Sequence, residues 1–229
     1  MKNVIITGAN GNLGTAVTDE FLNKGYRVIA AVETETAMRS LDGQENLVVF
    51  IVNLSNEDEA TKFIQDCIAQ YISIDAALLL VGGFAAGNIS VTSGKDLRKQ
   101  ISLNFETAFY CAKPLFAHMI TRNQGKIAFI GARPALLASQ GFGLLAYSLS
   151  KSLLFKLAEF LNEEAKGKNV SVSVIVPSTL DTPLNRKSMP DVNPNNWVKP
   201  SAIAEILEFL VSEKSNVLKE TILKVYNNA

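Results

Sequence analysis

The fold of this chain is decided at residues 7–14, Thr7-Gly8-Ala9-Asn10-Gly11-Asn12-Leu13-Gly14, which join a short apolar run to a helical pattern. Glycines allow a tight turn there and let backbone N–H groups approach a pyrophosphate at the start of a helix. A glycine triplet alone is a weak signal, but between a strand and a helix it is typical of dinucleotide binding. A glycine-rich turn without a ligand is the alternative. We expect the cofactor contacts to come from Gly8, Asn10, Gly11, Asn12, Leu13 and Gly14.

Short apolar runs alternate with helical patterns along the whole chain. The runs span residues 3–7, 27–32, 47–52, 75–81, 126–131, 170–176 and 221–226. Several are rich in Val and Ile, as buried parallel strands are. The alternation predicts a doubly wound (Rossmann) α/β fold, with a parallel sheet and helices on both faces. No linker divides the chain, so residues 1–229 are expected to form a single domain. Ser55 and Asp58 are expected to form a capping box for a helix at about 56–70.

Composition argues against several classes of function. Lysine plus arginine balances aspartate plus glutamate at 22 each, which gives no reason to expect nucleic acid or an anionic membrane as a partner. No apolar stretch reaches about 18 residues and no signal peptide is visible, so we expect a cytoplasmic protein. Cys67 and Cys111 are too few for a zinc motif or a disulfide framework. His118 is the only histidine, so we expect no metal site and acid–base chemistry on another residue type.

Glu33 ends the second apolar run, about 20 residues after the glycine turn, where an acid can bind the ribose hydroxyls of a dinucleotide. A carboxylate at this place repels a 2′-phosphate, and no lysine or arginine in the turn attracts one. The sequence therefore predicts NAD, with NADH preferred over NADPH. A solvated glutamate at a strand end is the alternative.

Tyr147 is the only one of the five tyrosines that is followed by lysine four residues later, at Lys151. On a helix these two side chains project from one face. A nearby ammonium is expected to lower the pKa of a tyrosine hydroxyl, which makes it a better proton donor and acceptor. In a chain that also carries the glycine turn, the pair predicts a proton-transfer site.

These features together resemble the short-chain dehydrogenase/reductase family over essentially the whole chain. The resemblance rests on the Thr-Gly turn, Asn104, the Tyr147/Lys151 pair and the turn at Val176-Pro177. It implies that Lys151 also holds the nicotinamide ribose, that Thr182 contacts the carboxamide and that Asn104 supports a water-linked proton path. The further cofactor contacts it implies are Asn53, Leu54, Val81, Gly82, Gly83, Pro177, Thr179 and Leu180.

The chain departs from the usual family pattern in informative ways. The middle glycine of the turn comes one residue early, at Gly11, and Leu80-Val81-Gly82-Gly83 replaces the usual Asn-Asn-Ala-Gly. Ala132 and Arg133 stand where the catalytic serine is usual, and whether Ser139 takes its place stays open. These departures resemble the dihydropteridine reductase subgroup. So do residues 81–88 and the twelve residues 179–190, which lie outside the generic family motifs.

The subgroup resemblance implies hydride transfer to a quinonoid dihydropterin or a similar small substrate, with Tyr147 donating the proton. Little oxyanion forms on such a ring, so a serine donor is less necessary. Phe84 is expected to offer an aromatic face to the substrate or to form a wall beside the cofactor. The substrate contacts that the resemblance implies are Phe84, Ala132, Arg133 and Asn185. A carbonyl reductase or alcohol dehydrogenase of the same fold and an NAD(H)-binding regulatory protein without turnover are the alternatives.

Two further segments carry expectations. Residues 178–200 hold four prolines, directly after Pro177, and follow a strand, so they are expected to form an irregular substrate lid at the ligand-bearing edge. The helix at about 143–166 is apolar around most of its circumference. One side must face the sheet, so the other is expected to meet a second subunit in a homodimer or homotetramer.

Overall fold

The structure is a computed structural model that describes residues 1–41, 43–218 and 220–228. Within these residues, seven strands form one parallel sheet in the order β3-β2-β1-β4-β5-β6-β7. The strands are β1 (Asn3–Thr7), β2 (Arg27–Val32), β3 (Leu47–Ile51), β4 (Ala76–Leu79), β5 (Gly125–Ile130), β6 (Val170–Pro177) and β7 (Ile222–Val225). The predicted α/β fold is confirmed, and each predicted strand is present with ends displaced by at most two residues.

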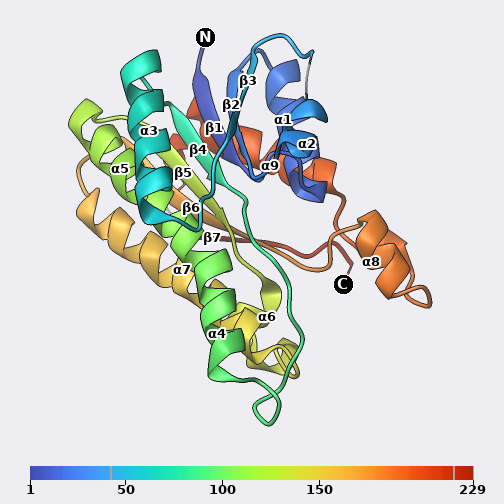
Figure 1. Ribbon diagram of the computed structural model, residues 1–229. Helices are drawn as coiled ribbons and strands as arrows, with labels where there is room; N and C mark the ends of the chain where they lie inside the picture. Colours follow the sequence, from blue (N-terminus) through green and yellow to red (C-terminus); the bar gives the residue numbers. More distant parts are fainter. Residues whose placement is uncertain (42, 219, 229) are drawn as a thin grey trace.

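Helices cover both faces of the sheet (Figure 1). They are α1 (Asn12–Asn23), α2 (Glu35–Arg39), α3 (Glu57–Tyr71), α4 (Gly94–Ile101), α5 (Thr107–Arg122), α6 (Arg133–Leu136), α7 (Leu145–Glu164), α8 (Pro183–Ser188) and α9 (Pro200–Val211). A π-helical turn, Ser102–Glu106, joins α4 to α5. Three 3-10 turns, Ala138–Gln140, Pro194–Asn196 and Glu213–Val217, complete the helical segments described.

Two hydrophobic cores lie on opposite faces of the sheet because side chains alternate along each strand. Ile5 of β1 packs with residues of α3, α5 and α7, whereas Val4 and Ile6 pack with α1 and α9. All three side chains are fully buried. Burial on both faces explains why the strands are almost continuously apolar.

The strand order reverses between β1 and β4. From β1 the chain proceeds outward to β2 and β3, and from β4 it proceeds the other way to β7. Ligands of such sheets bind beyond the carboxyl ends of the strands at this switch point. The connections leaving β1 through β6 at that edge carry the residues that the sequence singled out.

The predicted cap of α3 is wrong. Asn56, not Ser55, is the N-cap, and its side chain accepts a hydrogen bond from the backbone N–H of Glu59 at 3.1 Å. The N–H of Ser55 instead donates to Asn53 Oδ1 at 3.1 Å. Ser55 belongs to the turn at Asn53, so Asn56 caps α3 instead and the helix begins at Glu57.

No helix in the described part of the chain combines the length and apolarity that crossing a bilayer requires.

Candidate active site

The glycine turn after β1 is closely packed. Gly8 has a φ of +66°, a conformation that side chains disfavour. A Cβ on Gly14 would lie 2.0 Å from the carbonyl oxygen of Gly8, so only glycine fits there. The Thr7 hydroxyl accepts a hydrogen bond from the backbone N–H of Leu80 at 3.0 Å, which ties this turn to the end of β4. The turn is therefore held directly at the switch point.

The start of α1 fits a phosphate-bearing cofactor. Gly11 is the N-cap and provides no side-chain hydrogen bond to the first turn. Asn10, Gly11 and Asn12 are exposed, whereas Leu13 is half-buried. Uncapped N–H groups at a helix N-terminus attract anions, and the absence of side chains on the glycines leaves room for one. This turn therefore has the donors and the space that a dinucleotide pyrophosphate requires.

Glu33 follows β2 directly, at the same edge, and its side chain is exposed. The first cation after Glu33 along the chain is Arg39, whose guanidinium lies 3.3 Å from the carboxylate of Glu35. Further along the edge, Asn53 is exposed after β3 and Leu54 is buried. The charge that faces a ribose from this side is thus negative.

Lys151 is buried at the carboxyl edge of the sheet. Its ammonium donates a hydrogen bond to the carbonyl oxygen of Ile130 at 2.8 Å, at the end of β5. Burial lowers the pKa of Lys151 to about 8. A Cβ on Gly82 would lie 2.8 Å from Lys151 Nζ and 2.7 Å from Asn104 Oδ1. Lys151, Asn104 and Gly82 therefore meet at one point beyond β4 and β5.

Asn104 is fully buried in the π-helical turn between α4 and α5. Its Oδ1 accepts a hydrogen bond from the N–H of Gly83 at 2.8 Å, and its Nδ2 lies 3.0 Å from the oxygen of Gly83. The same Nδ2 is 3.0 Å from Gln100 Oε1 and from Ser150 Oγ. The side chain thus fixes the loop after β4 against α7. Sequence reasoning missed Gln100 and Ser150 because neither belongs to a motif with known spacing.

Tyr147 lies one turn before Lys151 on α7, as predicted from the spacing. Its pKa behaves differently from the expectation. Burial raises the pKa of Tyr147 to about 12, whereas the sequence predicted a lowering by the nearby ammonium. The reason is that the ammonium of Lys151 is directed to the backbone of Ile130 and burial dominates. Tyr147 is therefore a protonated hydroxyl at neutral pH.

Phe84 contacts Tyr147 directly. Their rings are 5.2 Å apart at 63°, an edge-on arrangement, while Phe84 itself is 66% exposed. The loop after β4 thus brings an accessible aromatic face to Tyr147. Val81 and Gly83, on the same loop, are half-buried, and Gly82 is exposed.

The loop after β5 holds the residues that replace the usual serine. Ala132 is buried at the start of α6. The guanidinium carbon of Arg133 lies 4.8 Å from the centre of the Tyr226 ring, and its buried Nε has no hydrogen-bond partner among the described residues. Ser139 is exposed in the 3-10 turn that follows.

The segment after β6 is an irregular loop that encloses α8, as predicted. Thr182 is the N-cap of α8, where its hydroxyl accepts a hydrogen bond from the N–H of Asn185. The Asn185 amide donates to the carbonyl oxygen of Leu180 at 2.8 Å. The side-chain amide of Asn185, an expected substrate contact, is therefore engaged in a hydrogen bond within the loop itself.

The same loop is held by an ion pair and by contacts at its base. Asp181 binds Arg186 through two hydrogen bonds of 2.6 and 2.9 Å. Pro177 is buried at the end of β6, and Thr179 pairs with Val198 across the base of the loop.

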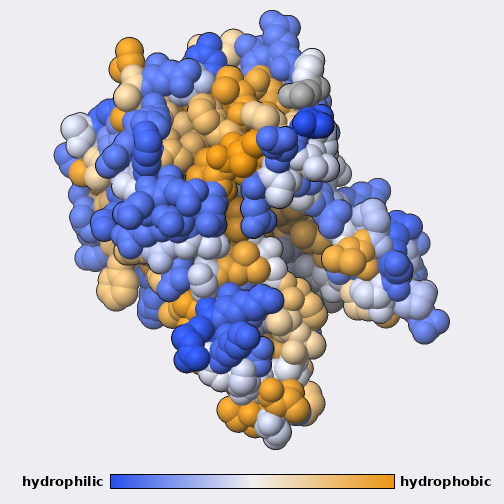
Figure 2. Space-filling model, in the orientation of Figure 1, coloured by the Kyte–Doolittle hydropathy of each residue, from blue (hydrophilic) through white to orange (hydrophobic). Residues whose placement is uncertain are grey.

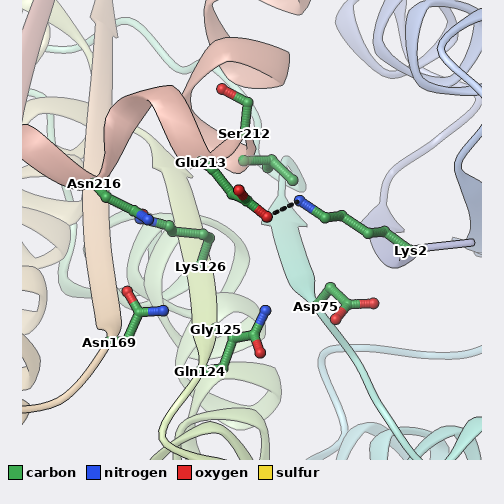
Figure 3. A pocket seen from close by; sticks show the side chains of 10 residues that line it. Lys2, Asp75, Gln124, Gly125, Lys126, Asn169, Ser212, Glu213 and Asn216 are labelled. Carbon is green, nitrogen blue, oxygen red and sulfur yellow. Dashed lines mark hydrogen bonds and ion pairs between the residues drawn. The ribbon is translucent and has the colours of Figure 1, made fainter.

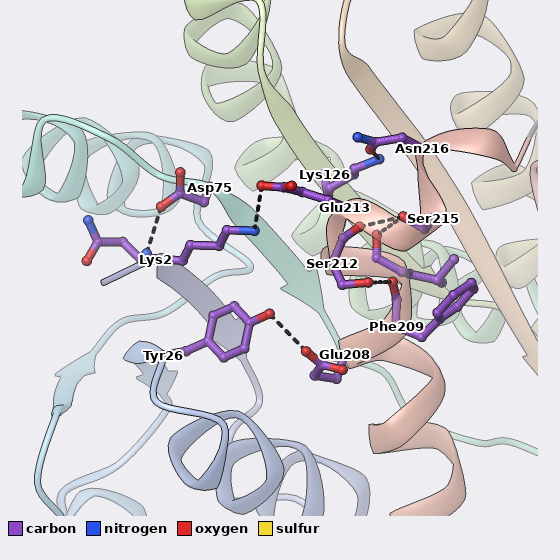
Figure 4. A network of polar contacts seen from close by, with 12 residues as sticks. Lys2, Tyr26, Asp75, Lys126, Glu208, Phe209, Ser212, Glu213, Ser215 and Asn216 are labelled. Atoms are coloured by element: carbon purple, nitrogen blue, oxygen red, sulfur yellow. Dashed lines mark hydrogen bonds and ion pairs between the residues drawn. The ribbon is translucent and has the colours of Figure 1, made fainter.

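The opposite edge of the sheet has a different character. A small cavity of about 30 Å³ is lined there by residues that include Lys2, Asp75 and Glu213 (Figure 3). Lys2 lies 4.0 Å from Glu213, and the Tyr26 hydroxyl donates to Glu208 at 3.0 Å (Figure 4). These contacts join the first strands to α9 and the turn after it. They lie at the amino edge of the sheet, opposite the carboxyl edge at which Lys151 meets Ile130.

Comparisons with known proteins agree with this geometry. The profile of a family described as short chain dehydrogenase matches residues 2–193. A dihydropteridine reductase of Dictyostelium discoideum is 29% identical over 97% of this chain and 94% of its own length. A 3-oxoacyl-(acyl-carrier-protein) reductase of Buchnera aphidicola subsp. Acyrthosiphon pisum (strain APS) is 27% identical over 98% and 95%. Among solved structures, ElxO with NADP bound superposes with a TM-score of 0.91 over 98% of this chain and 96% of its own, at 20% identity, which supports the fold alone.

Proposed function

Because the chain belongs to the short-chain dehydrogenase family of NAD(P)-dependent oxidoreductases, we propose that it is an NADH-dependent reductase of a quinonoid dihydropterin or a similar small substrate. One observation carries the proposal. A protonated Tyr147, a buried Lys151 and an exposed aromatic ring of Phe84 meet at the carboxyl edge, with Ala132 in place of a serine. This arrangement offers a proton and an aromatic face, but no hydroxyl at residue 132 to bind an oxyanion.

Tyr147 is the proton donor in this proposal. Its raised pKa keeps the hydroxyl protonated through the neutral range, as donation in the reducing direction requires. Lys151 is protonated below its pKa of about 8, and its positive charge supports the loss of a proton from Tyr147. Asn104 positions both the loop after β4 and α7 around them. A bound reduced nicotinamide supplies the hydride.

A cofactor fits the residues at hand. The turn of Gly8, Gly11 and Gly14 offers uncapped N–H groups to the pyrophosphate, and Glu33 offers its carboxylate to the ribose. The remaining proposed contacts are Asn10, Asn12, Leu13, Asn53, Leu54, Val81, Gly82, Gly83, Lys151, Pro177, Thr179, Leu180 and Thr182.

The NADH preference is tested at Glu33. The Glu33→Ala variant removes the charge that repels a 2′-phosphate, so we expect the ratio of kcat/KM for NADH to that for NADPH to fall at least tenfold. Glu35→Ala, also in this region but paired with Arg39, is the matched control. Equal KM values for the two cofactors in the unaltered protein would contradict the preference.

The reaction is tested by NADH oxidation with quinonoid dihydropterin, comparing the unaltered protein with Tyr147→Phe. Loss of the tyrosine proton is expected to lower kcat by 10²- to 10⁴-fold, with NADH binding unchanged in a fluorescence titration. Equal turnover by both proteins would refute Tyr147 as the donor.

Reduction of a carbonyl substrate is the second candidate function. It is favoured by the 3-oxoacyl reductase relative, whose identity to this chain is close to that of the dihydropteridine reductase. A parallel assay with acetoacetyl thioesters separates the two. A protein that binds NADH but oxidises none in a single turnover with either substrate would instead be a regulatory binder.

A further inference from the structure

The two loops that flank Tyr147 contain no charged residue. Neither residues 80–94 nor residues 134–150 include Asp, Glu, Lys, Arg or His, in a chain of which 19% is Asp, Glu, Lys or Arg. The first stretch leads from β4 into α4, and the second leads from α6 into the catalytic turns of α7. Loops at a protein surface are usually polar, so an uncharged pair beside a catalytic residue needs a reason.

These loops expose large apolar side chains. We call them the apolar rim, and its members are Phe84, Ile89, Val91, Leu137 and Phe142, with exposed fractions of 66%, 78%, 70%, 40% and 88%. Apolar surface is visible at the lower tip of the molecule in Figure 2, where Figure 1 draws the segments that precede α4 and α7. Clustered apolar surface of this kind marks a binding site, whereas single exposed residues do not.

Hydrogen bonds between the two loops build the rim. The N–H of Gly87 donates to the carbonyl oxygen of Gly143 at 2.7 Å, and the N–H of Leu145 donates to the oxygen of Gly87 at 2.9 Å. Beyond the rim, Ser93 and Asp96 form a capping box that anchors the first loop to α4. The rim is thus fixed in position before any ligand arrives, which lowers the entropic cost of binding.

We propose that the apolar rim binds an uncharged, apolar part of the substrate that extends outward from the reacting ring. The edge-on contact of Phe84 with Tyr147 makes the rim continuous with the catalytic hydroxyl. A substrate held at Tyr147 therefore has the rim as its nearest outward surface. This inference rests on the proposed function and adds the chemical class of the substrate's outer part.

The loops of the rim carry no cation, and two cations near Tyr147 already have other contacts. Arg133 lies over the ring of Tyr226, and Lys151 is buried with its ammonium on Ile130. The first cations beyond the rim lie on α4 and are Lys95, Arg98 and Lys99. An anionic group placed beside Phe84 would lose water without gaining a charged partner from either loop, which is costly. The rim thus disfavours substrates that carry a carboxylate or a phosphate on this side.

The test uses quinonoid dihydropterins with 6-alkyl chains of one to five carbons and a matched series that ends in a carboxylate. In the unaltered protein we expect kcat/KM to rise twofold to fourfold with each methylene, and to fall at least tenfold with the terminal carboxylate. The Phe142→Ser/Ile89→Ser variant is expected to lose the dependence on chain length. The control is Ile72→Ser/Val217→Ser, which removes two apolar residues, 81% and 82% exposed, that precede β4 and β7 at the other edge of the sheet.

A second measurement separates this inference from the proposed function. Calorimetric binding of non-reacting oxidised 6-alkyl pterins, in the presence of cofactor, is expected to tighten with chain length in the unaltered protein and in the Ile72→Ser/Val217→Ser control, but not in Phe142→Ser/Ile89→Ser. Tightening without turnover of the reactive series would support the rim and contradict the proposed function. Turnover with no dependence on chain length would overturn the rim and leave the function standing. A rim variant that changes the sedimentation coefficient but not the length dependence would show that the rim contacts a second copy, which also overturns the proposal.

Discussion

Lys151 shows how burial changes the chemistry of a single residue. Its ammonium has one backbone acceptor, Ile130, and no carboxylate forms an ion pair with it in the described part of the chain. Burial therefore lowers the pKa of Lys151 to about 8, while it raises that of Tyr147 to about 12. The two groups are both protonated below pH 8, so the reduction proposed above would have its proton donor and its supporting charge together.

The rate of reduction is expected to fall as pH rises through about 8, because Lys151 loses its charge there while Tyr147 stays protonated. In the Lys151→Arg variant the charge persists, so this decline should disappear from the kcat–pH profile even if kcat is lower. Persistence of the same decline in Lys151→Arg would show that another group titrates.

The free energy of unfolding is also expected to depend on pH because of the lowered pKa of Lys151. The folded pKa of Lys151 lies below the unfolded value of 10.5, so the unfolded chain binds more protons between about pH 8 and 10.5. The free energy of unfolding should therefore rise with pH over this range, by up to about 3 kcal/mol. Urea denaturation of Lys151→Met at several pH values should lack that rise. An identical pH dependence in both proteins would contradict the lowered pKa.

At the scale of elements, the loop around α8 is closed upon itself. Asp181, before the helix, binds Arg186 within it, and this hydrogen bonding lowers the pKa of the Asp181 carboxyl. At the base, the N–H of Asp181 donates to Val198. The expected lid is thus a short helix on a hydrogen-bonded stem.

We expect Asp181→Asn to raise KM for substrate severalfold while changing kcat less than twofold, because it weakens the hold on α8 without touching Tyr147. Limited proteolysis within residues 183–188 should become faster in the same variant. Lys187→Ala, an exposed neighbour with no ion pair among the described residues, is the control. An unchanged KM together with an unchanged rate of proteolysis would contradict the hypothesis that α8 acts as a substrate lid.

At the scale of the whole molecule, the apolar residues of α7 fall into a buried group and an exposed group. Leu154, Phe155 and Ala158 are buried against the sheet, whereas Leu149 and Phe160 are 46% and 71% exposed. A surface-exposed apolar stripe on a helix favours contact with another apolar surface. We propose that this stripe joins two copies of the chain.

Sedimentation is expected to report a dimer or tetramer at micromolar concentration, and Leu149→Glu/Phe160→Glu should dissociate it, because two charges on the stripe oppose its burial. Phe209→Glu, on α9 and 38% exposed, should leave the mass unchanged. A monomer in the unaltered protein would defeat the proposal.

The sequence by itself determined the order of strands and helices, the glycine turn and the spacing of Tyr147 and Lys151. These are local properties, set by apolar periodicity, by backbone sterics at Gly8 and Gly14, and by the pitch of a helix. One of these local predictions was wrong, since Asn56 rather than Ser55 caps α3.

Only the tertiary structure decided what depends on residues distant in sequence. The pKa of Tyr147 depends on its burial among loops from β4 and β5, and the ammonium of Lys151 is directed to Ile130, twenty-one residues away. Asn104 forms hydrogen bonds with Gly83 and Ser150 from a π-helical turn that no sequence pattern predicted. The loop after β4 and the loop before α7 meet only because their strands are neighbours in the sheet. Spacing along a chain fixes which side chains share a helix face, but folding alone sets their solvent, their partners and therefore their acidity.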